Sequence, residues 1–164
     1  MNLSKAMQEA FNQQINNELF SAYLYLSMAA HCDSANLPGA AKWLRVQFEE
    51  EQTHALKMFD YVIERGGQVC LKAIEAPTAT WKSTLAVFEQ VLQHEQHVSA
   101  GVYKLYEIAL AEKDYAAQTF IQWFIAEQVE EEKNAAAIVD NLKRIESHET
   151  AVLMLDHQLG KRGK

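Results

Sequence analysis

Residues 48–62, FEEEQTHALKMFDYV, decide the fold because polar residues interrupt the apolar stripe of a helix there. Glu51 and His54 lie within the stripe, and their i, i+3 spacing puts both side chains on one helical face. The apolar positions recur at helical spacing, at Phe48, Ala55, Met58 and Val62. A carboxylate and an imidazole on the core side of a helix predict a chemical site inside a helical bundle.

The same helical period extends along almost the whole chain, which predicts an all-α fold. Two prolines and six glycines leave room for long uninterrupted helices. The first helix is expected from about Ser4, a favourable N-cap, to about Cys32. Its expected inner stripe is Leu3, Met7, Phe11, Ile15, Ala22, Leu26 and Ala29.

Four more helical segments are expected after the first. The second begins near Pro38, a residue that suits the first turn of a helix, and stops at Gly66. The third is expected over about 83–112 and the fourth over about 114–145. A short amphipathic fifth segment covers 150–159.

The lengths of the connections predict a four-helix bundle. Short connections after the first and third helices make each pair an antiparallel hairpin. The connection from Gly66 to Lys82 is far longer than a bundle turn needs. About seventeen extended residues reach about 55 Å, whereas a helix of about 27 residues is about 40 Å long. This crossover can return along the whole bundle, so the third helix should run parallel to the second.

Composition limits the function classes. A formal charge of −7 argues against a nucleic-acid partner, which would need a basic face. We expect no signal peptide and no membrane span, since the chain has no apolar run of either kind. Cys32 and Cys70 stand alone rather than in CxxC pairs, which favours a reducing cytoplasm over a disulfide framework. We expect residues 1–164 to form a single domain because no linker interrupts them.

Polar residues interrupt all four core stripes near the middle of each helix. They are Glu18 and Tyr25, then Glu51 and His54, then Glu95, and finally Gln128 and Glu131. One such glutamate could equally face solvent, because a small error in helical phase would turn it outward. Four interruptions at matching depth favour a buried layer of carboxylates without a lysine or arginine.

A carboxylate in a dry core is unfavourable by several kcal/mol unless it is paired or coordinated. A pair of divalent cations is the simplest compensation for four of them. Carboxylate oxygens with one imidazole suit Fe(II), Mn(II) or Mg(II) better than zinc or Cu(I). Tyr25 could donate a hydrogen bond to the site or supply an electron, and a core tyrosine with a satisfied hydroxyl is the alternative. Trp123 is expected to be a core residue.

Several motifs occur in order along the chain. They are Glu18 followed by Tyr25, EEQTH at 50–54, HEQ at 94–96, QW at 122–123 and EQVEEEK at 127–133. Together they resemble the ferroxidase motifs of bacterial non-haem ferritins, over essentially the whole chain. The resemblance implies a ferritin-like four-helix bundle with a long crossover between helices two and three and a short C-terminal fifth helix.

The resemblance also implies a role for each residue. Glu18, Glu51 and His54 would hold a first iron, with Glu51 bridging to a second iron held by Glu95. Gln128 sits where such ferritins place a ligand or near-ligand. An adjacent third iron site is implied at Glu50, Glu127, Glu130 and Glu131, although an acidic solvated face is the alternative for Glu127 and Glu130.

The activity implied is that of a ferroxidase, which oxidises Fe(II) with dioxygen or hydrogen peroxide and deposits ferric mineral in a homo-oligomeric shell of twenty-four subunits. Haem is not expected, because Gln52 stands where bacterioferritins carry the haem-ligating methionine. The CxxC domain of rubrerythrins is absent from the sequence. Two alternatives remain open, namely a diiron peroxidase of the same fold and a non-enzymatic helical scaffold stabilised by metal.

Overall fold

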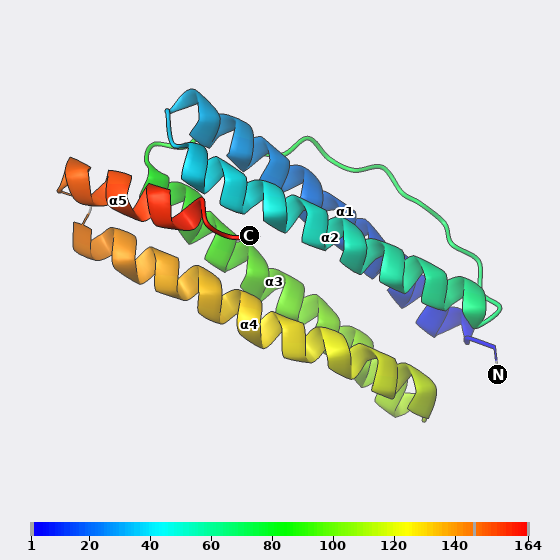
Figure 1. The fold of residues 1–164 in the computed structure, drawn as a ribbon. Coiled ribbons are helices and arrows are strands. Elements are labelled where there is room, and N and C mark those ends of the chain that lie inside the picture. Colours follow the sequence, from blue (N-terminus) through cyan, green and yellow to red (C-terminus); the bar gives the residue numbers. More distant parts are fainter. Residues whose placement is uncertain (1, 146, 164) are drawn as a thin grey trace.

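The computed structural model describes residues 2–145 and 147–163, and within these ranges it contains five α-helices and no strand. Four long helices form a bundle, and the fifth lies across one end of it (Figure 1). The helices are α1 (Lys5–Ser34), α2 (Pro38–Glu64), α3 (Thr84–Ala111), α4 (Tyr115–Ile145) and α5 (Glu149–Leu159). The predicted all-α fold is confirmed, and the predicted helix ends differ from the observed ones by only a few residues.

Local sequence explains where the helices begin. The Ser4 hydroxyl caps α1 by accepting a hydrogen bond from the Met7 amide, and Ser83 caps α3 by accepting one from the Ala86 amide, each at 3.1 Å. Pro38 occupies the first turn of α2, where a missing N–H leaves no internal bond unmade.

The topology is also as predicted. The pairs α1–α2 and α3–α4 are antiparallel hairpins, and the crossover between α2 and α3 runs along the length of α1 (Figure 1). Asn12 fixes this crossover, because its amide donates to the Gln68 carbonyl at 3.0 Å and accepts from the Cys70 amide at 2.9 Å. Ser27 donates to the Thr78 carbonyl at 2.6 Å further along. Helix α3 therefore runs parallel to α2.

Two apolar clusters form the core, one toward each end of the bundle. The cluster nearer α5 includes Met28, Leu44 and Phe88, and the other includes Phe11, Met58 and Ile121. The predicted polar layer lies between them along each helix. The site is therefore enclosed by hydrocarbon on two sides, which lowers the local dielectric constant.

Leu26 is a predicted core residue that the structure places at the surface. Leu26 is 39% exposed, whereas Tyr25, Ala29 and Cys32 are buried. Because successive heptads of a straight α-helix rotate by about 20°, the buried face of α1 moves away from Leu26 in the second half of the helix.

Helix α5 is fastened to the start of α2 by a buried carboxylate. Asp156 accepts hydrogen bonds from the Gly39 amide at 3.1 Å and from the Ala40 amide at 2.7 Å. Gly39 permits this contact, because a Cβ there would lie 1.7 Å from the Asp156 carbonyl oxygen. This joint fixes where the residues after α5 lie.

Both cysteines are free, with Cys32 buried and Cys70 exposed. Among the described residues, no helix combines the length and the hydropathy needed to cross a membrane.

Candidate metal centre

The structure brings the predicted layer together at the middle of the bundle. Each of the four long helices contributes at least one of its polar side chains. The buried members are Glu18, Tyr25, Glu51, His54, Glu95, Gln128 and Glu131. The alternative that these glutamates face solvent, through a small error in the assumed helical phase, is therefore excluded in all four helices.

Glu18, Glu51 and His54 form the tightest group. One possible ligand atom from each lies within 4.8 Å of the others, and Nδ1 of His54 is 3.6 Å from Oε2 of Glu51. These distances suit a single cation shared by three ligands. The chain thus places two carboxylates and an imidazole around one point, as the i, i+3 spacing predicted.

Two carboxylate oxygens in this group lack any hydrogen-bond partner among the described residues. They are Oε2 of Glu18 and Oε2 of Glu51, in side chains that are each 1% exposed. An unmet buried acceptor costs about 1–3 kcal/mol, and more when it is charged. The donor set therefore fits a divalent cation, which would supply the missing partner to both oxygens.

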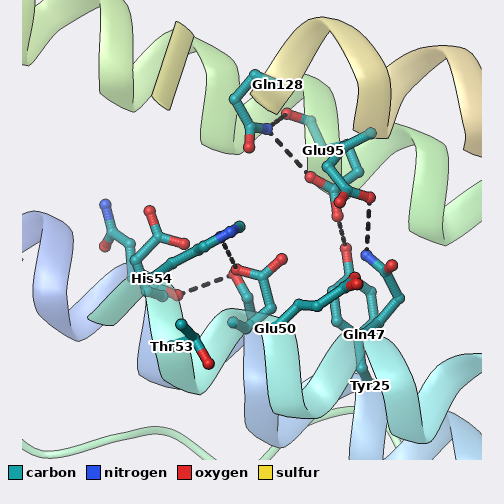
Figure 2. A network of polar contacts seen from close by, with 12 residues as sticks. Tyr25, Gln47, Glu50, Thr53, His54, Glu95 and Gln128 are labelled. Atoms are coloured by element: carbon teal, nitrogen blue, oxygen red, sulfur yellow. Dashed lines mark hydrogen bonds and ion pairs between the residues drawn. The ribbon is translucent and has the colours of Figure 1, made fainter. Parts of the chain in front are cut away.

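Glu95 is held from two sides. The Tyr25 hydroxyl donates to its Oε1, and the Gln128 amide donates to its Oε2 at 3.1 Å (Figure 2). Tyr25 is therefore a fully buried tyrosine whose hydroxyl is satisfied by a carboxylate of the layer, and its role as an electron source stays a prediction. Because the nitrogen of the Gln128 amide faces Glu95, a metal contact through its oxygen remains a prediction.

The metal-free layer is strongly biased toward protonation. Burial, and then the negative charge of neighbouring carboxylates, raises the pKa of Glu18 and of Glu51 well above the usual range. Burial also raises the pKa of Glu95. The pKa of Glu131 is raised to about 7, by burial first and by the charge of Glu95 second.

Two glutamines support the layer, and the sequence interpretation missed both. Gln14 donates to Oε1 of Glu18 at 2.8 Å, and Gln47 donates to Oε2 of Glu131 at 2.9 Å. Gln14 precedes Glu18 by four residues, and Gln47 precedes Glu51 by four. Extending each polar stripe back by one helical turn would have found them.

A histidine behind Tyr25 was also missed as a supporting residue. Nε2 of His94 lies 2.7 Å from the Ser21 hydroxyl, and its ring meets the Tyr25 ring edge-on at 5.8 Å. Burial, together with the charge of His97, lowers the pKa of His94 to about 4. A neutral imidazole thus packs against the tyrosine that holds Glu95.

Of the residues expected at a third iron site, Glu131 is buried with the layer, and the other three are more exposed. Glu50 and Glu127 are half-buried, and Glu130 is exposed. Glu50 is paired with Arg162, whose Nη2 lies 2.6 Å from its Oε2. Among the described residues, no lysine or arginine forms a salt bridge with the four carboxylates of the layer, but the turn after α5 brings Arg162 to its edge, beside Glu50.

Trp123 corrects another expectation. It is 38% exposed and meets the His54 ring edge-on at 5.5 Å, with the Lys57 ammonium 4.0 Å from its ring centroid. It therefore flanks the imidazole at the bundle surface and is not a core residue.

Comparison with known proteins places this architecture in a family. A family model described as a ferritin-like domain matches residues 8–145. The chain is 43% identical over 160 residues to a bacterial non-heme ferritin of Bacteroides fragilis, covering 98% of this chain and 99% of that protein. It is 39% identical to one of Staphylococcus aureus, covering 98% and 96% respectively.

A solved structure agrees closely with the fold. An open-pore ferritin from the hyperthermophilic archaeon Archaeoglobus fulgidus matches with a TM-score of 0.97 at 51% identity, covering 98% of this chain and 99% of that one. A humanized archaeal ferritin matches with the same TM-score at 50% identity, with 98% of each chain covered. This chain therefore belongs to the ferritin family, among the non-haem ferritins that store iron.

Proposed function

We propose that this protein oxidises Fe(II) at the central layer and stores the ferric product inside a shell of its own copies. The observation that carries the proposal is the pair of buried carboxylate oxygens, on Glu18 and Glu51, that accept no hydrogen bond from the described residues. Iron is the substrate and the cargo of this site. Family membership makes iron the cation of choice among those that the ligands suit.

Glu18, Glu51 and His54 would hold one iron, with Glu51 shared between it and a second iron on Glu95. This division follows the tight group of three ligands and the separate support of Glu95 by Tyr25 and Gln128. Gln128 would complete the second position by rotating its amide oxygen toward the metal. Two Fe(II) ions supply two electrons, which reduce one dioxygen to hydrogen peroxide or one hydrogen peroxide to water.

The buried acids of the layer also bind and release protons. Acids with a raised pKa hold protons in the metal-free layer, and they must release them when divalent cations bind. Tyr25 orients Glu95 through its hydroxyl. The apolar clusters on either side keep water from the layer, which strengthens the attraction between carboxylate and cation.

Storage needs an enclosed space that one bundle does not provide. We infer a homo-oligomeric shell, with twenty-four subunits as in the resembled family, located in the cytoplasm. The archaeal neighbour described as an open-pore ferritin supports a shell with openings. Measuring the mass of the native particle tests this inference, and a monomer or dimer at micromolar concentration would contradict it.

Anaerobic addition of Fe(II) followed by air tests the chemistry. We expect rapid oxidation of about two irons per subunit, followed by accumulation of many irons in each particle. A diiron peroxidase would consume peroxide without retaining mineral. A scaffold that only binds metal would oxidise Fe(II) no faster than buffer does.

A further inference from the structure

The turn after α5 places a cation at the edge of the acidic layer. Nη2 of Arg162 lies 2.6 Å from Oε2 of Glu50, and the guanidinium lies 4.4 Å from the centroid of the Trp43 ring. The joint between Asp156 and Gly39 fixes the helix that carries this turn. Arg162 is therefore directed at Glu50 by the packing of α5 and by the indole that it covers.

The pairing leaves the arginine only partly satisfied. Nη1 of Arg162 is buried without a hydrogen-bond partner in the described part of the chain, and its side chain is 21% exposed. Leaving a buried donor unmet is unfavourable. Glu50, in contrast, is 41% exposed, so a metal ion from solvent can reach it in addition to the Arg162 guanidinium.

The ion pair between Arg162 and Glu50 lies close enough to the candidate metal site to influence cation binding there. Glu50 is adjacent in sequence to Glu51, and the charge of Arg162 also acts on Glu131 across the bundle. Arg162 lines a pocket of about 430 Å³ between α2, α4 and α5, together with Trp43 and Asn134. A metal ion that bound Glu50 would meet the guanidinium at short range.

We propose that Arg162 is the resident counter-cation of Glu50, which a third divalent cation must displace, releasing the turn at 160–163 as it binds. This inference rests on the proposed function, because it assumes that the first two cations occupy the buried layer. A single carboxylate does not stabilise a guanidinium and a divalent cation at the same distance, because the two positive charges repel each other. The coupling must be reciprocal, so removing Arg162 has to strengthen binding of the third cation.

Equilibrium titration with Zn(II), which undergoes no oxidation, measures this coupling directly. The variants are Arg162→Gln, Arg162→Lys, Glu50→Gln and the double variant of Arg162→Gln with Glu50→Gln. Lys161→Gln is the matched control, because Lys161 is an exposed cation in the same turn. We expect Arg162→Gln to tighten the third Zn(II) about tenfold, or about 1.4 kcal/mol.

The other variants locate the cause. Arg162→Lys should stay within about threefold of wild type, because it keeps the charge, and Lys161→Gln should change nothing. Glu50→Gln should weaken the third site, and adding Arg162→Gln to it should give no further gain. A gain in the double variant, or equal affinities for Arg162→Gln and wild type, would overturn the proposal.

A second measurement follows the turn itself. Trp43 emission in a background of Trp81→Phe and Trp123→Phe reports on the guanidinium that covers its ring. We expect emission to change with the third Zn(II) equivalent in this protein, and not when Arg162→Gln is added. A change already complete at the first two equivalents, or none, would contradict release of the turn. Absence of any tight pair of Zn(II) sites would instead defeat the proposed function.

Discussion

Two buried carboxylate sites in this protein have opposite hydrogen-bonding states. At the joint of α5 and α2, Asp156 is 9% exposed, and its two oxygens accept from the Gly39 and Ala40 amides. In the central layer, Glu18 and Glu51 are each 1% exposed, and each has an oxygen that accepts no hydrogen bond from the described residues. Both sites bury acids, but only the joint supplies all the donors that its acid needs.

This difference distinguishes a carboxylate that only stabilises the fold from a carboxylate that is a candidate metal ligand. Backbone N–H groups at a helix start stabilise a carboxylate in place and need no cation. A layer whose acids repel one another and leave two carboxylate oxygens without a donor is unstable by itself, and it gains most from a ligand of high positive charge. Burial alone therefore does not indicate a metal site, whereas unmet oxygens gathered at one level make the layer a candidate metal site.

The largest expected effect breaks the central layer at its imidazole. Replacing His54 with Ala should abolish the fast phase of Fe(II) oxidation, because it removes a ligand without stranding a new charge. Stopped-flow absorbance would measure the rate, with circular dichroism to verify the fold. The neighbouring exposed Thr53→Ala is the matched control and should keep the wild-type rate. Wild-type speed in the His54 variant would refute its assignment as a ligand.

The second prediction uses pH to distinguish the two sites. Glu131 holds a proton in the folded metal-free protein up to about pH 7, whereas the unfolded chain releases it near pH 4.5. The free energy of unfolding should therefore fall as pH rises through this window, by up to about 3 kcal/mol from this group at 1.36 kcal/mol per unit. Burial and neighbouring carboxylates also raise the pKa of Glu18 and Glu51 well above the usual range, so these two groups add to the fall.

Chemical denaturation at several pH values, with and without Zn(II), would measure this effect. Metal should restore the lost stability because it binds only the folded layer. Glu131→Gln should reduce the fall, since the variant has no proton to lose at that position. A free energy of unfolding that changed neither with pH nor with added metal would count against a buried site shared by these carboxylates.

The third prediction concerns Asp156, the carboxylate at the joint between α5 and α2. Asp156→Ala should lower the free energy of unfolding by about 1–2 kcal/mol, the usual effect of losing a helix cap. The loss should be the same with and without metal, and the first two cations should bind as before. Thermal unfolding with metal titration provides the measurement. Loss of the two tight metal sites in this variant would show that the joint and the layer are not independent.

The smallest effect is expected at the exposed edge. Glu130→Ala should leave the oxidation of the first two irons unchanged and alter the free energy of unfolding by less than about 0.5 kcal/mol. If Glu130 contributes to a third site, the oxygen consumed per iron should shift in later turnovers. An oxygen electrode would record the ratio, and an unchanged value would leave Glu130 as ordinary surface charge.

The sequence predicted most of the layer because its residues obey a local rule. Glu18, Glu95 and Glu131 each sit on a core stripe, so helical periodicity alone predicted their burial. The fold followed from the stripes together with the length of the crossover. Leu26 was misplaced because the buried face rotates along a long helix, which a fixed period of 3.6 residues ignores.

Arg162 and Asp156 escaped prediction for a different reason. Their roles depend on how α5 folds back onto α2, and that angle follows from the close contact at Gly39 and not from any local period. The sequence around Arg162 offers no signal that it pairs with Glu50, more than a hundred residues earlier. Tertiary contacts of this kind need the structure.

Anomalous diffraction from crystals soaked anaerobically in Fe(II) tests the central claim most directly. We predict two strong iron peaks inside the bundle, one among Glu18, Glu51 and His54 and the other between Glu51 and Glu95, with none at Asp156. An iron-free layer, or iron found only on the exposed acids, would contradict the claim that unmet buried carboxylates mark the site of chemistry.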